Sequence, residues 1–170
     1  LSLDPRALAL FRVYFGLLLF ADVLRRIPLA GLYYSNEGVL PNHYALYAPL
    51  SARPFSLLFT LSSSTEVKVA FLAMAACHLA LALGLFTRVM QVLAILFTVS
   101  INQRNPLLEN GGGVVLVILA VWTAFLPLGA TMSVDSLRAR DGGAPAAPPT
   151  RVVSVVALGL LLQTAAIYFF

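Results

Sequence analysis

The segment 102–113, NQRNPLLENGGG, gathers more groups capable of chemistry than any other stretch of this sequence. It places Arg104, Glu109 and Asn110 close to Pro106 and to three consecutive glycines. Glycines at a helix start leave backbone N–H groups unpaired, and such groups bind anions or carbonyl oxygens. The alternative is a capped turn in which the glycines act only as a hinge. Arg104, Glu109 and Asn110 are therefore candidate catalytic residues.

A second polar stretch, Tyr33–Tyr44, contains Glu37 and His43 among three tyrosines. A belt of aromatic residues at a membrane surface would explain the tyrosines. It would not explain a carboxylate and an imidazole, which are the usual groups for proton transfer. Glu37 and His43 are thus also candidate catalytic residues.

Arg12 and His78 lie within long apolar runs. An ionisable side chain in an apolar medium needs a partner or water, and such residues in membrane proteins often serve function. Arg12 either extends to nearby headgroups or holds a ligand or carboxylate. His78 hydrogen-bonds to another helix or water, or binds a ligand. We regard both as candidate cofactor-binding residues.

Several common chemistries have no signature here. The sequence lacks the spacings of zinc proteases, serine hydrolases, phosphate loops and dinucleotide-binding folds. The two histidines, His43 and His78, are 35 residues apart, so we predict no metal site. The single cysteine, Cys77, excludes an internal disulfide.

The composition indicates the elements that must position these residues. Hydrophobic residues make up 60% of the 170 positions, charged residues only 11%, and the mean hydropathy is +0.91. Soluble domains carry about 25% charged residues. The net charge of +4 is dispersed between apolar runs, which suggests contact with anionic lipid headgroups and not with nucleic acid. We predict an all-α integral membrane protein embedded in a lipid bilayer.

Apolar runs predict a single transmembrane domain over residues 1–170, with about five helices. The predicted spans are 7–24, 67–86, 89–104, 112–128 and 152–170. The last run is still apolar at Phe170, so we expect the fifth helix and the domain to be incomplete there. Helix starts are expected at Asp4-Pro5 and at the capping box of Ser63 and Glu66.

The connections between these spans are predicted to differ in character. Residues 25–66 are rich in aromatics and prolines, which favours an ordered segment at the membrane surface. Thr87-Arg88 should form a tight turn between two helices, and 138–150 an extended linker. Odd-numbered connections share one side of the membrane, so 25–66 and 102–111 should converge. Six basic residues against five weakly favour a cytoplasmic amino terminus.

Four stretches of the chain resemble the HTTM (horizontally transferred transmembrane) domain family, which is related to the membrane domain of vitamin K-dependent γ-carboxylase. The resemblance lies in Leu3–Ile27, Tyr33–Pro41, Asn102–Gly112 and Phe125–Leu137, followed by the terminal QTAAIYFF. It implies a quinone-like or lipid cofactor, and a catalytic lysine that would follow Phe170. The family's asparagine–histidine pair is matched here by Asn110 and glycines. This departure implies a bacterial-type relative, located in the inner membrane, whose substrate is not a peptide glutamate.

Two hypotheses about function follow, and the sequence leaves open whether the protein is an enzyme. The first is an HTTM-type membrane enzyme with chemistry at the face bearing Glu37, His43, Arg104, Glu109 and Asn110. The second is a non-catalytic membrane subunit that packs against other membrane proteins. A transporter would require broken helices or inverted repeats, and the two halves of this chain do not mirror each other.

Overall fold

The computed structural model describes residues 2–43, 47, 54–108, 110–142, 152–153 and 156–169. Within these residues the regular secondary structure is helical, apart from one antiparallel pairing of two residues each, β1 (Ser2–Leu3) with β2 (Val152–Val153). The α-helices are α1 (Pro5–Arg26), α2 (Ala30–Tyr34), α4 (Ser64–Leu83), α5 (Thr87–Arg104), α6 (Gly111–Ala124), α7 (Val134–Asp141) and α8 (Val156–Phe169). Short 3₁₀ turns cover Ile27–Leu29, Leu57–Thr60 and Pro106–Leu108.

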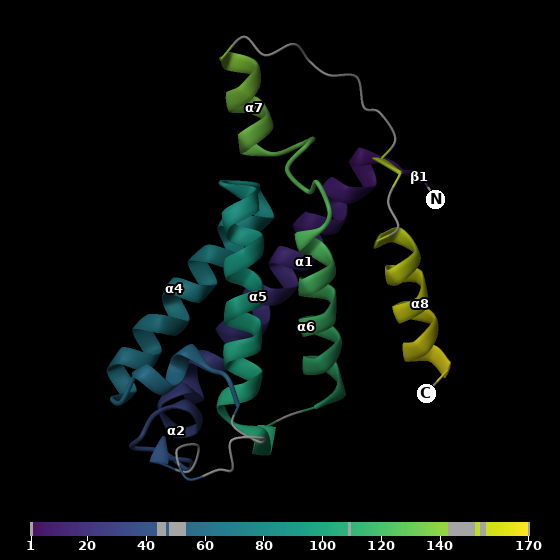
Figure 1. Cartoon of the computed structure of the whole chain (residues 1–170). Helices are drawn as coiled ribbons and strands as arrows, with labels where there is room; N and C mark the ends of the chain where they lie inside the picture. The colour runs from purple at the N-terminus through teal and green to yellow at the C-terminus, as the bar shows by residue number, and fades with distance from the viewer. Residues whose placement is uncertain are drawn as a thin grey trace.

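The helices form one bundle in which α1 packs along α4 and passes behind α5 and α6 in the view of Figure 1. Neighbours in the sequence also pack together, α4 with α5 and α5 with α6. Helix α8 packs on α6, and α7 lies beyond the N-terminal end of α5 (Figure 1). The end of α1 and the start of α6 consequently lie at the same end of the bundle.

Local signals in the sequence explain where these helices begin and end. Asp4 caps α1 by accepting a hydrogen bond from the Arg6 N–H at 2.8 Å, and Pro5 opens the helix. The predicted capping box of Ser63 and Glu66 is confirmed at the start of α4. Helix α4 ends at Gly84, whose φ of 75° is the left-handed conformation that favours glycine.

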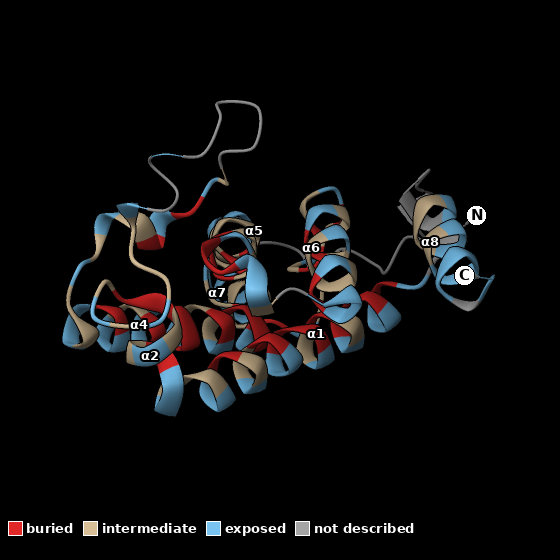
Figure 2. Ribbon diagram, turned by 90° about the horizontal axis from the view of Figure 1, so that it is seen from below, coloured by how far each residue is buried: buried red, intermediate tan, exposed pale blue. Residues whose placement is uncertain are grey.

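The core lies where α1 meets α4 and α5. A Cβ atom on Gly16 of α1 would come within 2.8 Å of the Ala82 backbone in α4, so only glycine permits this close approach. Phe15, Leu19 and Leu81 are buried beside it. Figure 2 shows the continuous buried face of α1, whereas α8 is mostly exposed along its described residues.

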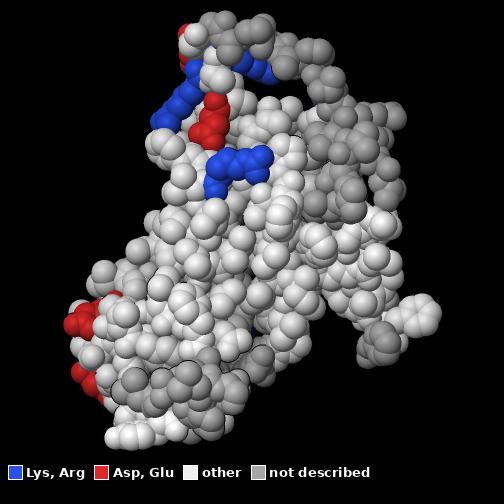
Figure 3. All heavy atoms as spheres, in the orientation of Figure 1, with Lys and Arg blue, Asp and Glu red and all other residues white. Residues whose placement is uncertain are grey.

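Two helical stretches, Pro5–Tyr34 and Ser64–Leu83, are long and apolar enough to cross a membrane. Helices α6 and α8 contain shorter apolar stretches, Gly111–Ala124 and Leu158–Ile167. On the face drawn in Figure 3, charged side chains gather toward two ends, and the surface between them is almost entirely uncharged.

The structure corrects two predicted connections. The turn between the second and third spans comes earlier than predicted, at Gly84–Phe86, and Thr87-Arg88 already belong to α5. The predicted linker 138–150 is wrong in its first part, because Arg138–Asp141 complete α7. A capping box of Ser133 and Ser136 starts this helix. Residues 143–150 lie outside the described part of the chain.

Candidate groove between α1 and α6

Two adjoining cavities form a groove between the end of α1 and the start of α6, and they share Arg25, Arg26 and Asn110. The first, of about 290 Å³, is bordered by α2, by the turn Ile27–Leu29 before it and by the turn Pro106–Leu108. The second, of about 420 Å³, continues along α1 and α6. We call these two cavities together the α1–α6 groove. Its remaining lining residues are Leu18, Ala21, Asp22, Leu29, Tyr33, Tyr34, Leu108, Gly112, Gly113 and Leu116.

Helical spacing gives the groove its two chemically different ends. Leu18, Asp22 and Arg25 stand about one turn apart, so they follow one face of α1 from mid-helix to its last turn. Leu116 lies opposite on α6, about one turn beyond Gly112 and Gly113. The groove therefore has an apolar end toward the middle of the bundle and a polar end at its surface.

Asp22 and two arginines form an ion-pair cluster at the polar end. The Asp22 carboxylate accepts from Arg25 Nε at 2.9 Å and from Arg26 Nε at 2.8 Å, and Arg25 Nη2 lies 2.7 Å from it. Arg26 also donates to the Tyr34 hydroxyl at 2.7 Å. Two guanidinium groups and one carboxylate leave a net charge of +1. The Arg25 side chain is 68% exposed and that of Arg26 only 13%, so Arg25 is the freer of the two.

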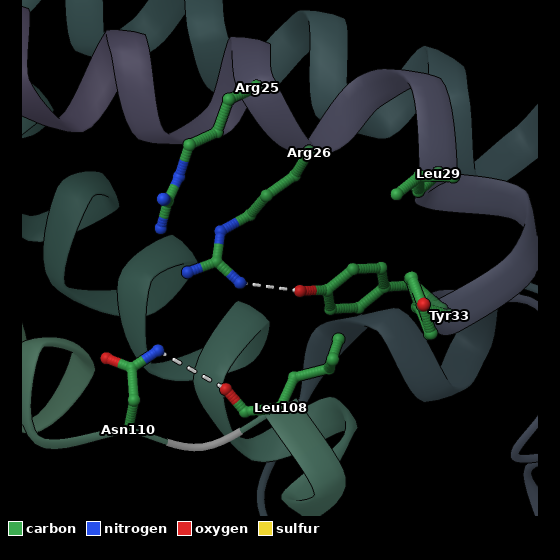
Figure 4. Close-up of a pocket in the computed structure, with 7 residues that line it drawn as sticks. Arg25, Arg26, Leu29, Tyr33, Leu108 and Asn110 are labelled. Atoms are coloured by element: carbon green, nitrogen blue, oxygen red, sulfur yellow. Dashed lines mark hydrogen bonds between the residues drawn. The ribbon is translucent and has the colours of Figure 1, made fainter.

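Asn110 closes the polar end from the side of α6. Its Oδ1 accepts from the Gly113 N–H at 2.9 Å and caps the helix, while its Nδ2 donates to the Leu108 carbonyl at 3.4 Å. Figure 4 shows Arg25 and Arg26 reaching from α1 toward Asn110 and Leu108. A Cβ on Gly111 would meet no atom within 4 Å, so this helix start is open. The first N–H groups of a helix carry partial positive charge, which adds to the arginine charge.

Among the predicted catalytic residues that the structure describes, Arg104, Glu37 and His43 do not join Asn110 in the groove. Arg104 is buried and donates to the Ser35 carbonyl at 3.4 Å, with its guanidinium 5.1 Å from the Phe59 ring centre. Glu37 is exposed and accepts from the Ser64 N–H at 3.3 Å, at the start of α4. His43 is exposed, and Glu109 lies outside the described residues.

Arg12, a predicted cofactor-binding residue, points to the opposite end of the bundle from the groove. Its guanidinium is buried and makes four hydrogen bonds to backbone carbonyls. The acceptors are Ala82 at 3.3 Å, Leu128 at 2.7 Å, Thr131 at 3.3 Å and Met132 at 2.6 Å. We call this arrangement the Arg12 latch, since it ties α1 to the end of α4 and to the segment after α6.

Asp135 in α7 holds the neighbouring turn at the same end. Its carboxylate accepts from the Phe86 N–H at 2.9 Å and from the Thr87 N–H and hydroxyl, both at 2.7 Å. Burial raises the pKa of Asp135, but the hydrogen bonds from Thr87 and Phe86 and the charge of Arg138 outweigh it, and the pKa lies below its usual value. Asp135 thus caps α5 from a helix that the sequence did not predict.

His78, the other predicted cofactor-binding residue, is buried in α4 with its ring 6.4 Å from that of Phe97. It lines a separate small cavity of about 10 Å³ between α1, α4 and α5. Asp22 lines this cavity as well as the groove, and it is the residue the two spaces have in common. The further polar lining residues are Thr98 and Asn102 of α5.

Sequence reasoning missed Arg25 and Arg26 as site residues. Asp22 and Arg26 are four residues apart and form an ion pair, but such a pair by itself indicates only a helix end. The useful signal was the coincidence of Arg25-Arg26 with the glycine-rich start of α6 on the same side of the predicted bundle. Among the described residues, no group of three or more His, Cys, Asp or Glu side chains is placed to hold a metal ion.

Comparison with known proteins adds no relative to this description. No family model, no curated protein and no solved structure matches the chain.

Proposed function

We propose that this chain is an integral membrane protein that binds an anionic, phosphate-bearing lipid in the α1–α6 groove. The observation that carries the proposal is the division of the groove into a cationic end and an apolar end. A lipid has the same division, with a charged headgroup joined to hydrocarbon chains. The headgroup would lie against Arg25, Arg26 and the start of α6, and a chain against Leu18 and Leu116.

The membrane part of the proposal is a bundle of about five spans. It is supported by the two helices of spanning length, by the apolar stretches in α6 and α8, and by the uncharged surface in Figure 3. Exposed leucines along α8, among them Leu158, Leu161 and Leu162, suit contact with lipid or with a membrane partner. In this bundle the groove would open toward one surface of the bilayer, where headgroups lie.

We propose binding, and no particular reaction, because the acidic group described in the groove is already paired with arginines. Asp22 is the one carboxylate among the groove residues that the structure describes, and both of its oxygens accept from arginines. A lipid ligand agrees with the lipid or quinone-like cofactor that the HTTM resemblance implies. The reaction implied by that resemblance stays a prediction.

The test compares lipid retention in nanodiscs that contain phosphatidylglycerol and phosphatidylcholine, followed by native mass spectrometry. Arg25→Gln removes the exposed guanidinium and leaves the Arg26–Tyr34 bond in place. We expect the preference for phosphatidylglycerol to fall tenfold or more, because a charge-assisted hydrogen bond contributes roughly 1.5–3 kcal/mol. Arg6→Gln, at the other end of α1, removes the same charge and should leave the preference unchanged.

A further arm separates a lipid from a free anion. Inorganic phosphate should compete poorly, since it lacks the chain that would contact Leu18 and Leu116. Efficient competition by phosphate would mean that the site takes the anion alone. Equal lipid retention by the wild-type protein and Arg25→Gln would refute the proposal.

A further inference from the structure

The imidazole of His78 is buried without a hydrogen-bond partner in the described part of the chain. The residue is 1% exposed, and although the Leu19 carbonyl lies nearby, neither Nδ1 nor Nε2 makes a hydrogen bond of normal distance and angle. A neutral imidazole carries one N–H donor and one acceptor nitrogen. Buried polar groups in folded proteins are nearly always hydrogen-bonded, to protein or to an ordered water. The position of His78 therefore calls for a specific neighbour.

The small cavity beside His78 has the size and lining of a water site. Its volume of about 10 Å³ gives room for the centre of one water molecule and for no larger ligand. A buried water needs two to four polar partners. Asp22, Thr98 and Asn102 offer oxygen atoms in addition to the imidazole.

The hydrogen bonds of these neighbours leave acceptors available. Thr98 donates its hydroxyl proton to the Ala94 carbonyl at 2.7 Å, so the hydroxyl oxygen retains lone pairs. Asn102 Nδ2 donates to the Thr98 carbonyl at 3.1 Å, which leaves the side-chain oxygen as an acceptor. A water that accepts from the His78 N–H could then donate one proton to Asp22 and the other to Thr98 or Asn102.

We propose that one water molecule occupies this cavity and joins the buried imidazole of His78 to the Asp22 carboxylate. Because Asp22 also pairs with Arg25 and Arg26, the water completes a hydrogen-bonded chain from the α1–α6 groove to the centre of the bundle. His78 is a positioning residue in this chain, since it fixes Asp22 through the water. The water site stands independently of the lipid, whereas its link to lipid binding rests on the proposed function.

Solid-state NMR on the whole chain in phosphatidylcholine nanodiscs tests the water site directly. The sequence has two histidines, so histidine labelled with ¹³C and ¹⁵N gives two imidazole signals, and His43→Gln assigns them. We expect magnetisation to pass from water protons to the His78 ring, and the His78 signals to move in Asp22→Asn. Asp141→Asn, the same change at the exposed end of α7, should leave them in place.

A second variant keeps every charge and fills the cavity. Val23 lines the cavity, and Val23→Ile adds one methylene group, which takes much of the space of a single water. We expect this variant to fold and to lose the water transfer to His78. Absence of transfer in the wild-type protein, or undiminished transfer in Val23→Ile, would overturn the water site.

The link to the groove has its own measurement. Adding phosphatidylglycerol to the nanodiscs should move the His78 signals in the wild-type protein and not in Arg25→Gln. Unchanged His78 signals in a protein shown to retain phosphatidylglycerol would overturn the link alone. Failure of retention itself would refute the proposed function and would not affect the water site measured in phosphatidylcholine.

Discussion

The two ends of α1 use the same side chain in opposite ways. Near the start, the Arg12 guanidinium is buried and directs four hydrogen bonds to backbone carbonyls. At the end, Arg25 and Arg26 share one carboxylate beside an open groove. The donors of Arg12 are nearly all paired within the protein, whereas the exposed Arg25 can also meet a ligand.

The partners of an arginine therefore indicate its role better than its position in an apolar helix does. Backbone carbonyls cannot be exchanged for a ligand without opening the bundle, so the Arg12 latch serves the fold. One carboxylate paired with two arginines leaves a net positive charge for an anion. Predicted effects should therefore fall on stability at one end and on binding at the other.

The largest expected effect is at the latch. Arg12→Met keeps a long apolar stem but leaves four carbonyls without their donor, and a buried unpaired acceptor costs roughly 1–3 kcal/mol. We expect the free energy of unfolding to fall by about 3 kcal/mol or more, measured as thermal unfolding in a mild detergent. Lipid preference in the folded fraction should match wild type. Wild-type stability of this variant would show that the latch is dispensable.

The next largest loss of stability is expected at Gly16, midway along α1. Alanine forms helices better than glycine by about 1 kcal/mol, so Gly16→Ala would stabilise an unhindered helix. Here the new Cβ would lie 2.8 Å from backbone atoms of Ala82, and α4 would have to move. We expect a net loss of about 1–3 kcal/mol in the same assay. Gly111→Ala, with open space around the new Cβ, is the matched control.

At the groove, substitutions of Arg25 and Arg26 should differ in their effect on stability. Arg26→Gln loses its bonds to Asp22 and to the Tyr34 hydroxyl in a half-buried setting, so we expect a loss of about 1–2 kcal/mol in stability. Arg25→Gln should change stability by less than about 0.5 kcal/mol, because exposed ion pairs contribute little. Both should weaken phosphatidylglycerol retention. A stability loss in Arg25→Gln as large as in Arg26→Gln would remove the distinction between them.

Much of the fold was readable from the sequence, because helix ends depend on nearby residues. Asp4, Ser63 and Glu66 act within their own first turns, and their roles were predicted correctly. Helix α7 was missed because its start at Ser133 and Ser136 precedes a stretch whose glycines and prolines suggested a linker. A capping signal and a composition signal competed there, and the capping signal prevailed.

The site was less predictable, because its contacts join residues far apart in the chain. Asn110 was predicted and lines the groove, but Arg25 and Arg26 become site residues only when α1 meets α6. Arg104 and Glu37 share the expected side of the bundle with Asn110, yet each has its own partner elsewhere. The end of the bundle at which residues lie limits which of them can meet, and packing decides which of them do.

The smallest expected effect is a dependence of stability on pH at the end that holds the Arg12 latch. The pKa of folded Asp135 lies below its unfolded value of about 3.9, so the ionised carboxylate favours the folded state above that pH. This contribution to stability is lost as the pH falls through the lower pKa that Asp135 has in the folded protein. Thermal unfolding should thus show the wild-type protein losing stability relative to Asp135→Asn below about pH 4.

The Asp135 carboxylate accepts three hydrogen bonds from the turn before α5 and from its first residue, so its ionised form is tied to that turn. If wild type and Asp135→Asn lose stability in parallel between pH 7 and pH 3, other carboxylates control the acid response. The turn would then be held by packing, and the contrast between the two ends would rest on Arg12 alone.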